Sequence, residues 1–209
     1  MPQSSGSYTE NVEGKNCIIV CGGSNQCISK GYITDVLSHF NEGDILLLQN
    51  ETSNVSFAMQ EAKARGMKIV FNASPITETL LEYPLELVDY FMINEVEGKA
   101  LSMVEDDDYE VILTALVSRF PNAAIVLTLG EQGVWYQDKT TRARHGIYRV
   151  EVADTTAAGD TFCGYFLACM AKGMSIPDTL EMASKASAIV VSRPGASDSI
   201  PTWDEVQNS

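Results

Sequence analysis

The sequence lacks several features that define whole classes of protein. No apolar run approaches the ~20 residues that a membrane-spanning helix needs, and the polar first seven residues contain no signal-peptide core. Only two histidines are present, too few for a histidine-based metal site. Basic residues are scarce, with 14 Lys and Arg against 28 Asp and Glu, for a net charge of -14. This charge argues against nucleic acid and anionic membranes as partners. From the lack of a membrane span and of a signal-peptide core, we expect a soluble, cytoplasmic protein.

Two further absences concern the cysteines and the first predicted turn. The five cysteines are an odd count without a C-x-x-C pair, which is typical of reduced thiols in a cytosol. No G-x-G-x-x-G follows the first predicted strand, which argues against a dinucleotide-dependent oxidoreductase. No internal repeat or interdomain linker is evident. With 209 residues, 45% of them hydrophobic, we expect a single domain over residues 1–209.

What the sequence does contain is an alternation of short apolar runs and helical patterns. Strands are predicted at residues 16–21, 44–49, 68–72, 90–93 and 124–129, and helices at 29–40, 55–65, 109–120 and 177–192. The apolar run at 44–49 is typical of a parallel strand covered on both faces. Residues 134–137 and 143–152 predict a β-hairpin. This order indicates an α/β fold with a mostly parallel sheet.

The stretch D-T-T-A-A-G-D at residues 154–160 carries the strongest chemical signal. It lies between a β-like segment at 148–152 and an apolar helix at 165–172. Ala157, Ala158 and Gly159 let the backbone turn tightly at a helix start, where free N–H groups bind anions such as phosphate. Asp160 beside them is a base for a hydroxyl proton, as phosphoryl transfer to an alcohol requires. The alternative is an ordinary turn with Asp160 as the helix N-cap.

Three other patterns follow predicted strands. Asn94 and Glu97 lie one helical turn apart, although N-x-x-E also describes a capping box. The T-L-G-E-Q-G run at 128–133 ends another strand, but alone it describes any hairpin loop. Glu51 follows the strand at 44–49, at the sheet edge where ligands bind in open α/β folds. A helix-capping role for Glu51 is equally open.

Taken in this order, the motifs resemble those of the ribokinase (PfkB) family of carbohydrate kinases. The resemblance implies a three-layer α/β/α Rossmann-like fold and ATP-dependent phosphorylation of a sugar hydroxyl, with ribose to ribose 5-phosphate as the expected reaction. Fructose, a ketodeoxy acid or a nucleoside are alternative acceptors. It implies Asp160 as catalytic base, an anion hole at residues 157–159, and sugar contacts from Glu51 and Asp160. Cys163 departs from the family, which usually carries Asn there.

The resemblance also implies two sets of cofactor-binding residues. ATP with Mg²⁺ is expected at Asn94, Glu97, Thr128, Leu129, Gly130, Glu131, Gln132, Gly133, Gly159 and Asp160. A K⁺ ion is expected at main-chain carbonyls of Asp154, Thr156, Val190, Arg193, Gly195 and Ser199, since carbonyl oxygens are hard donors. Because the chain is acidic, backbone donors and a divalent cation must hold the phosphates in place of a basic patch.

The resemblance covers residues 16–203 and lacks the start of a family member. The family's N-terminal segment carries a strand with a sugar-binding Asp, a G-G-x-x-x-N run and a β-sheet lid. We therefore expect a fold without these N-terminal strands and the lid, and weak or absent sugar kinase activity of this chain. We also expect an exposed apolar sheet edge that invites self-association, for example as a homodimer. The alternative function is a non-catalytic remnant that binds nucleotide or a partner.

Overall fold

The computed structural model describes residues 6–12 and 15–209, with side chains from Gly22 onward. The chain divides into two compact units, Met1–Phe91 and Met92–Ser209. Six strands are hydrogen-bonded in the order β3-β4-β5-β6-β7-β8, and β1 and β2 form a separate two-stranded sheet. The predicted α/β class with a mostly parallel sheet is confirmed. A single domain over residues 1–209 stays a prediction.

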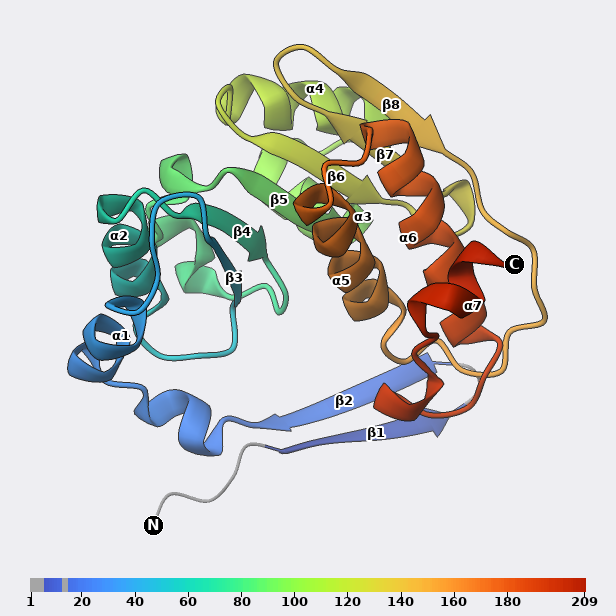
Figure 1. Cartoon of the computed structure of the whole chain (residues 1–209), viewed down its shortest axis with the longest axis horizontal. Coiled ribbons are helices and arrows are strands. Elements are labelled where there is room, and N and C mark those ends of the chain that lie inside the picture. The colour runs from blue at the N-terminus through green and yellow to red at the C-terminus, as the bar shows by residue number, and fades with distance from the viewer. Residues whose placement is uncertain (1–5, 13–14) are drawn as a thin grey trace. The chain divides into compact units, whose positions relative to one another are not determined.

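Figure 1 labels the strands and helices that the described residues of the first unit form. They are β1 (Gly6–Val12), β2 (Lys15–Cys21), α1 (Lys30–Leu37), β3 (Ile45–Gln49), α2 (Val55–Ala64) and β4 (Lys68–Asn72), with short 3₁₀ turns at Gly23–Cys27, Glu78–Glu82 and Leu85–Leu87. The α2 helix buries Val55, Ala58, Met59 and Ala62, one stripe at helical spacing. This stripe packs with β4, whose central residues are fully buried, and forms the core of the unit.

One strand prediction for this unit is confirmed and another is corrected. Residues 16–21 are a strand as predicted, but β2 pairs antiparallel with β1, which we did not predict, and not with the six-stranded sheet. The strand predicted at 44–49 is not covered on both faces, because Ile45 and Leu47 of β3 are 37% and 45% exposed. Ile45 and Leu47 point to the same face of β3, so that face is open to solvent while Leu46 and Leu48 on the other face are half-buried. A continuous apolar run therefore did not report whether both faces are covered.

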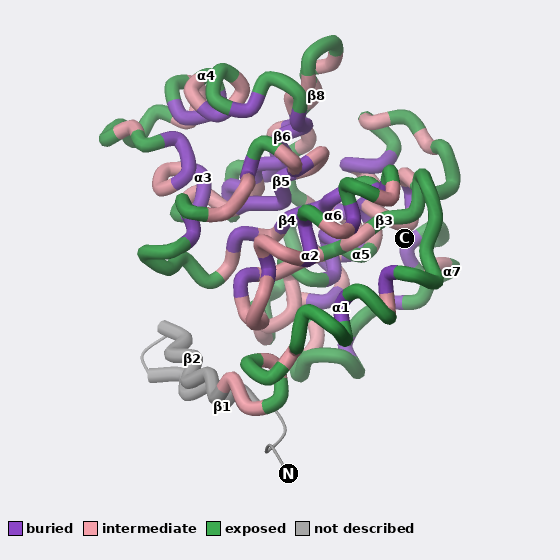
Figure 2. Tube along the Cα trace, turned by 90° about the vertical axis from the view of Figure 1, so that its left-hand side faces the viewer, coloured by how far each residue is buried: buried purple, intermediate pink, exposed green. Residues whose placement is uncertain are grey.

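The second unit contains the remaining elements. They are β5 (Tyr90–Asn94), which begins in the first unit, α3 (Glu95–Ser102), α4 (Tyr109–Arg119), β6 (Ala124–Thr128), β7 (Val134–Gln137), β8 (Arg142–His145), α5 (Ala158–Ala171), α6 (Ile176–Val191) and α7 (Trp203–Gln207), with 3₁₀ turns at Gly130–Gln132 and Ser197–Ser199. The first four residues of β6 are buried, and buried backbone runs through the strands in Figure 2. Helices α5 and α6 pack on each other, and Phe166 of α5 stacks on Tyr136 of β7.

The hairpin predicted at 134–137 and 143–152 forms, but its second strand is shorter than expected. Strand β8 pairs antiparallel with β7 and ends at His145, opposite Val134, the first residue of β7. The predicted β-like segment at 148–152 is therefore wrong, because no residue of β7 remains for it to pair with. Tyr148 instead lies beside α6, where its hydroxyl donates to Glu181 at 3.5 Å and Lys185 lies over its ring. The backbone N–H of Ala153 then donates to Val191 O at 2.8 Å.

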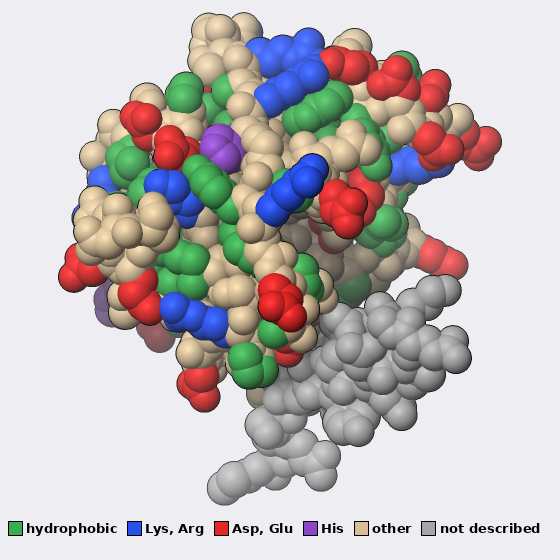
Figure 3. All heavy atoms as spheres, turned by 90° about the vertical axis from the view of Figure 1, so that its right-hand side faces the viewer, with side chains coloured by type: hydrophobic (Ala, Val, Ile, Leu, Met, Phe, Trp, Pro, Cys, Tyr) green, Lys and Arg blue, Asp and Glu red, His purple; other side chains and the backbone are tan. Residues whose placement is uncertain are grey.

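Several surface properties bear on function. None of the helices in the described part of the chain is long and apolar enough to cross a bilayer. The cysteines whose side chains are described, Cys27, Cys163 and Cys169, carry free thiols. On the face drawn in Figure 3, acidic and basic side chains are interspersed, with one small group of adjacent basic side chains at the top of the view. Phosphate binding on this chain therefore calls for backbone donors, as its net charge of -14 indicates.

Candidate active site

The first turn of α5 has an unusual backbone conformation. Ala157, its N-cap residue, is left-handed with φ 62° and ψ 8°, and its side chain offers no capping hydrogen bond. A non-glycine residue in this region costs about 1–2 kcal/mol, and such strain is concentrated at functional sites. Asp160 is the third helical residue and is exposed. The alternative in which Asp160 is the N-cap is therefore wrong.

The amide groups at this helix start are only partly used within the protein. The Ala158 N–H donates to Thr155 O at 3.3 Å, a long hydrogen bond, and the Thr161 N–H donates to Ala157 O at 2.9 Å. The Gly159 N–H donates to no acceptor in the described residues. The Thr161 hydroxyl is buried without a hydrogen-bond partner there, which is uncommon for a buried polar group. An exposed carboxylate thus stands beside an uncapped, electropositive helix terminus.

Cys163 lies one turn further along α5, at the position where the resemblance is imperfect. Its side chain is buried. Burial, and to a smaller extent the Asp160 carboxylate, raises the pKa of the Cys163 thiol to about 12. The thiol therefore stays protonated at neutral pH and is no nucleophile. The substitution at this position is a packing change next to Asp160.

Asp154 joins the loop before α5 to the loop after α6. Its Oδ1 accepts from the Thr156 N–H at 2.9 Å, and its Oδ2 accepts from the Gly195 N–H at 3.3 Å. The pKa of the Asp154 carboxyl is lowered by hydrogen bonding, first from the Thr156 side chain and then from the Thr156 and Gly195 N–H groups. The carboxyl is therefore ionised at neutral pH. The Asp154 N–H also donates to Val191 O at 3.2 Å. The two loops are thereby fixed beside each other.

The other residues predicted around a monovalent ion belong to the same cluster. The Ser199 hydroxyl, which is buried, donates to Gly195 O at 2.9 Å, and the Arg193 N–H donates to Val190 O at 3.1 Å. The structure thus brings Asp154, Thr156, Gly195 and Ser199 together through direct contacts, with Val190 and Arg193 at the adjoining end of α6. Whether their carbonyl oxygens bind a monovalent cation stays a prediction.

Arg193 also connects this cluster to the C-terminal helix α7. Its Nη2 donates to Glu205 Oε1 at 2.8 Å, while the Thr202 N–H and hydroxyl donate to Glu205 Oε2 at 2.7 and 3.0 Å. These bonds, that of the Thr202 backbone first, lower the pKa of Glu205 from 4.5 to about 2. A carboxyl whose pKa is lower in the folded protein stabilises the fold above its unfolded pKa. That stabilisation is lost as the pH falls through the folded value.

We expect the Glu205→Gln variant to melt at a lower temperature than the wild type at pH 7. The difference should shrink as the pH falls from 4.5 toward 2, because the wild-type carboxyl then becomes protonated as well. Thermal unfolding followed by circular dichroism across this range measures it. Asp204→Asn serves as the control. It removes a neighbouring charge of α7 but leaves the hydrogen bonds of Glu205 with Thr202 and Arg193 in place. A difference that is independent of pH would contradict this assignment.

Asn94 and Glu97 form a complete capping box at the start of α3. Asn94 Oδ1 accepts from the Val96 and Glu97 N–H groups, both at 2.9 Å. The Glu97 carboxylate accepts from the Asn94 N–H and from Asn94 Nδ2, both at 3.0 Å, and Glu97 is only 4% exposed. The capping alternative for this motif is confirmed. Each oxygen of the buried Glu97 carboxylate therefore accepts one hydrogen bond from Asn94.

We expect Asn94→Ala to lower the free energy of unfolding by about 2–3 kcal/mol. The cap itself contributes about 1 kcal/mol, and the buried Glu97 carboxylate loses one donor, at about 1–2 kcal/mol. Urea denaturation measures the loss. The matched control is Thr202→Ala, because Thr202 caps α7 with the same type of box around the exposed Glu205. Equal losses in the two variants would mean that burial of Glu97 adds nothing.

The T-L-G-E-Q-G run forms the turn between β6 and β7. The Thr128 hydroxyl donates to Ile93 O at 3.3 Å, so the turn begins beside the end of the strand that carries Asn94. Gly130 and Gly133 have positive φ angles of 50° and 81°, and Leu129 is buried. Glu131 and Gln132 lie exposed at the tip of the turn. The Leu129 N–H donates to Gly133 O at 2.8 Å and closes it.

Glu51 belongs to the first unit and follows β3, as predicted. Its carboxylate makes no hydrogen bond or ion pair with the described residues, and Asn54, not Glu51, is the N-cap of α2. The sequence interpretation missed the neighbouring Asn50, which is buried. Asn50 Nδ2 donates to Pro75 O at 2.7 Å, and Tyr83 donates to its Oδ1 at 2.7 Å. Asn50 thus positions the loop that carries Glu51. The sequence signal that could have identified Asn50 is a short polar residue directly after an apolar strand.

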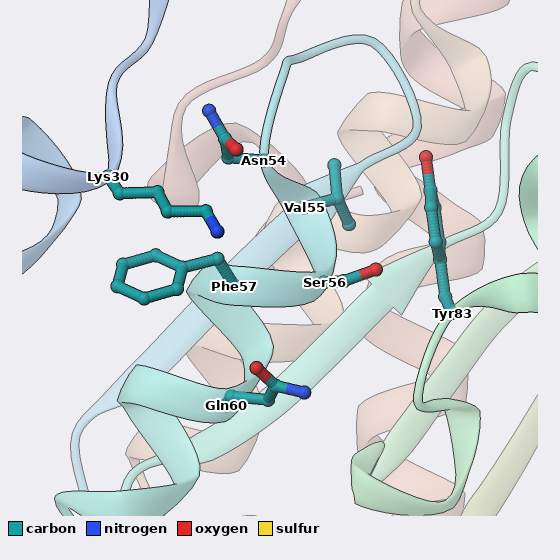
Figure 4. A pocket seen from close by; sticks show the side chains of 7 residues that line it. All are labelled: Lys30, Asn54, Val55, Ser56, Phe57, Gln60 and Tyr83. Atoms are coloured by element: carbon teal, nitrogen blue, oxygen red, sulfur yellow. The ribbon is translucent and has the colours of Figure 1, made fainter.

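A pocket of about 300 Å³ also lies in the first unit (Figure 4). It is lined by Lys30, Asn54, Val55, Ser56, Phe57, Gln60 and Tyr83. The Lys30 ammonium lies over the Phe57 ring at 5.2 Å, and Asn54 and Tyr83 are already hydrogen-bonded to other parts of the unit. None of the catalytic or binding residues that we predicted from the sequence lines this pocket. The pocket is therefore separate from the chemistry that the motifs indicate.

Comparison with known proteins bears directly on these motifs. The family model described as pfkB family carbohydrate kinase matches residues 7–203. The ribokinase of Haemophilus influenzae is 34% identical over 196 residues, covering 91% of this chain and 63% of that protein. The crystal structure of the Thermotoga maritima ribokinase superposes with a TM-score of 0.80 at 30% identity, covering 99% of this chain and 69% of that one.

A second solved structure, the ribokinase of Cryptococcus neoformans var. grubii in complex with ADP, has a TM-score of 0.83 at 25% identity. It covers 99% of this chain and 71% of that one. The chain thus spans about two thirds of the length of the relatives it matches. Because the family model matches nearly all of the described residues, the chain belongs to the pfkB family of carbohydrate kinases.

Proposed function

We propose that this chain takes part in ATP-dependent phosphorylation of a sugar hydroxyl, with ribose converted to ribose 5-phosphate. The observation that carries the proposal is the first turn of α5. There the exposed Asp160 carboxylate follows a strained, uncapped helix start whose amides are available to an anion. The relatives named ribokinase support ribose as the acceptor. The chain spans about two thirds of the length of these relatives, so the kinase activity is a proposal for this chain.

The proposed proton transfer needs one base and one acceptor hydroxyl. Asp160 accepts the proton of the sugar's primary hydroxyl, whose oxygen then bonds to the γ-phosphorus of ATP. The bond from that phosphorus to the bridging oxygen breaks, and ADP leaves. The N–H groups of residues 157–159 stabilise the charge that develops on the transferred phosphoryl oxygens. The left-handed Ala157 supports this role because it turns the chain directly into the helix.

The remaining predicted residues are proposed to position the two substrates. The turn at 128–133 and Asn94 hold the nucleotide, and their link through Thr128 and Ile93 supports a shared site. Glu51 is proposed to bind the sugar, which its unpaired carboxylate after β3 favours. Contacts of this kind would hold the reacting atoms in line.

Two cations are part of the proposal. Mg²⁺, when bound, neutralises charge on the phosphates, and Glu97 acts on it through water, since Asn94 occupies the carboxylate. The described residues contain no cluster of three His, Cys, Asp or Glu side chains, and Mg²⁺ typically relies on substrate phosphates and few carboxylates. K⁺ is proposed at the carbonyl cluster around Asp154, where the contacts to Thr156 and Gly195 support it. We also propose a cytoplasmic location, which the free thiols favour.

The test is calorimetric titration with an ATP analogue and Mg²⁺, followed by a coupled assay for ADP formation with and without ribose. ADP formation that depends on ribose supports the proposal. Fructose and a nucleoside in place of ribose test the other acceptors. Nucleotide binding without turnover on any acceptor would favour a non-catalytic nucleotide-binding role for this chain. Absence of nucleotide binding would contradict both the kinase activity and the non-catalytic nucleotide-binding role.

A further inference from the structure

The loop that carries Glu51 is held on one side by the segment that follows β4. Asn50, which is 8% exposed, donates its N–H to Ser74 O at 2.9 Å and its side-chain amide to Pro75 O at 2.7 Å. Tyr83 donates to Asn50 Oδ1 at 2.7 Å. These contacts fix the residue before Glu51 and leave Glu51 itself to another part of the first unit.

The 3₁₀ turn Gly23–Cys27 holds Glu51 directly. Gln26 Nε2 donates to Glu51 O at 3.0 Å. Two positions further along the loop, the Ser53 N–H donates to Asn25 O at 2.9 Å. The Glu51 carboxylate, in contrast, makes no hydrogen bond or ion pair with the part of the chain that the structure describes. The main chain of Glu51 is therefore fixed, while its side chain is available to a ligand.

Gly22 makes room for the Gln26 side chain. Its φ of -61° and ψ of -31° are ordinary right-handed helical values, so the backbone does not require glycine there. A Cβ atom at Gly22 would lie 2.5 Å from Gln26 Cγ and 3.3 Å from Gln26 Nε2. Because Cγ lies near the base of the side chain, it cannot move aside without moving the amide that binds Glu51 O. The missing side chain at Gly22 thus helps to set the position of the Gln26 amide.

We propose that Gln26 is a positioning residue for the sugar, which it affects by fixing the main chain of Glu51. This rests on the proposed function, in which the Glu51 carboxylate binds the sugar. An ionised carboxylate only accepts hydrogen bonds, so the hydroxyl groups of a sugar are matching donors. A carboxylate on a fixed main chain loses less conformational freedom when the sugar binds, and its affinity is higher for that reason.

The test begins with Gln26→Met, which keeps the length of the side chain but cannot donate to Glu51 O. We expect ribose to bind about three- to tenfold more weakly, the usual contribution of one hydrogen bond. The affinity for an ATP analogue should not change, and calorimetric titration measures both. Gln60→Met is the matched control, since Gln60 is an exposed glutamine of the same unit without a hydrogen bond to the described residues. It should bind ribose as the wild type does.

A double-mutant cycle tests the route from Gly22 through Gln26. Gly22→Ala alone should weaken ribose binding about as much as Gln26→Met, because the new Cβ displaces the Gln26 side chain. In a Gln26→Ala background the same substitution should have no further effect, since Cγ is then absent. An equal effect of Gly22→Ala in both backgrounds, or equal losses of ribose and nucleotide affinity in Gln26→Met, would overturn the proposal.

Backbone order at Glu51, measured by ¹⁵N relaxation without sugar, separates this proposal from the proposed function. The order parameter should fall in Gln26→Met and stay unchanged in Gln60→Met. Unchanged order in Gln26→Met would overturn the role of Gln26, whether or not ribose binds. A wild type that binds no ribose, but whose Glu51 loses order in Gln26→Met, would contradict the sugar-binding role of Glu51. The part of the present proposal that concerns the sugar would then be wrong as well.

Discussion

Replacement of Asp160 by asparagine is expected to lower phosphoryl transfer to the sugar by about 100- to 10,000-fold, the usual contribution of a general base. The amide keeps the size of the side chain but does not accept the hydroxyl proton. Nucleotide binding should be retained or become tighter, because a negative charge next to the phosphates is removed. Coupled ADP assays and calorimetric titration with an ATP analogue measure the two effects.

The control for this variant is Asp178→Asn. Asp178 occupies the same third position in α6 as Asp160 does in α5, and both side chains are exposed. Both substitutions remove a charge that interacts with the helix dipole, at about 0.3–1 kcal/mol, and Asp178→Asn also weakens the hydrogen bond that Asp178 Oδ2 accepts from the Ser175 hydroxyl at 2.6 Å. Turnover and nucleotide affinity should both be unaffected in Asp178→Asn. Turnover of Asp160→Asn equal to that of the wild type would show that Asp160 is not the base. A loss of nucleotide affinity as large as the loss of turnover would show that Asp160 acts in nucleotide binding.

The second large effect is expected at Gly133, in the turn between β6 and β7. Its φ of 81° and ψ of -136° lie in a region that is almost restricted to glycine. A Cβ atom here would collide with the His145 carbonyl oxygen and lie 2.9 Å from Gly146 Cα. We expect Gly133→Ala to lower the free energy of unfolding by about 3–5 kcal/mol, from backbone strain and overpacking together. The collision also displaces the end of β8, which pairs with the start of β7.

Gly130→Ala in the same turn is the matched control. Gly130 also has a positive φ, 50°, but a Cβ there would meet no atom within 4 Å. Only the left-handed backbone then opposes alanine, at about 1–2 kcal/mol. Urea denaturation of the two variants separates the steric contribution from the backbone contribution. Equal losses would mean that β8 moves aside at no cost, which would contradict the close approach of His145.

Local sequence patterns predicted the type and order of most elements. The helix at 55–65 and the strand at 68–72 were predicted nearly to the residue, because apolar periodicity and a closing glycine are local signals. The motifs at 94–97, 128–133 and 154–160 also lie just after strands or at helix starts as predicted. Their chemical roles stay predictions. Family membership, in contrast, is confirmed.

The errors arose where distant residues decide the outcome. Residues 148–152 have a strand-like composition, but β7 begins at Val134 and leaves them no partner, so they lie along α6. The apolar run at 44–49 suggested burial on both faces, yet Ile45 and Leu47, which share one face of β3, are exposed. Strand composition reports what a residue prefers, whereas pairing depends on which other strand is available.

By itself, the sequence determined the family, the α/β class and the place of each motif, because residue type, spacing and turn chemistry act within a few positions of the chain. Only the tertiary structure decided that Asp154 joins two loops 41 residues apart, and that Tyr148 lies beside α6 and not in a strand next to β7. It also decided that, among the described strands, β3 pairs with β4 alone. These features depend on hydrogen bonds and strand pairings between segments far apart in the chain, which local preference does not encode.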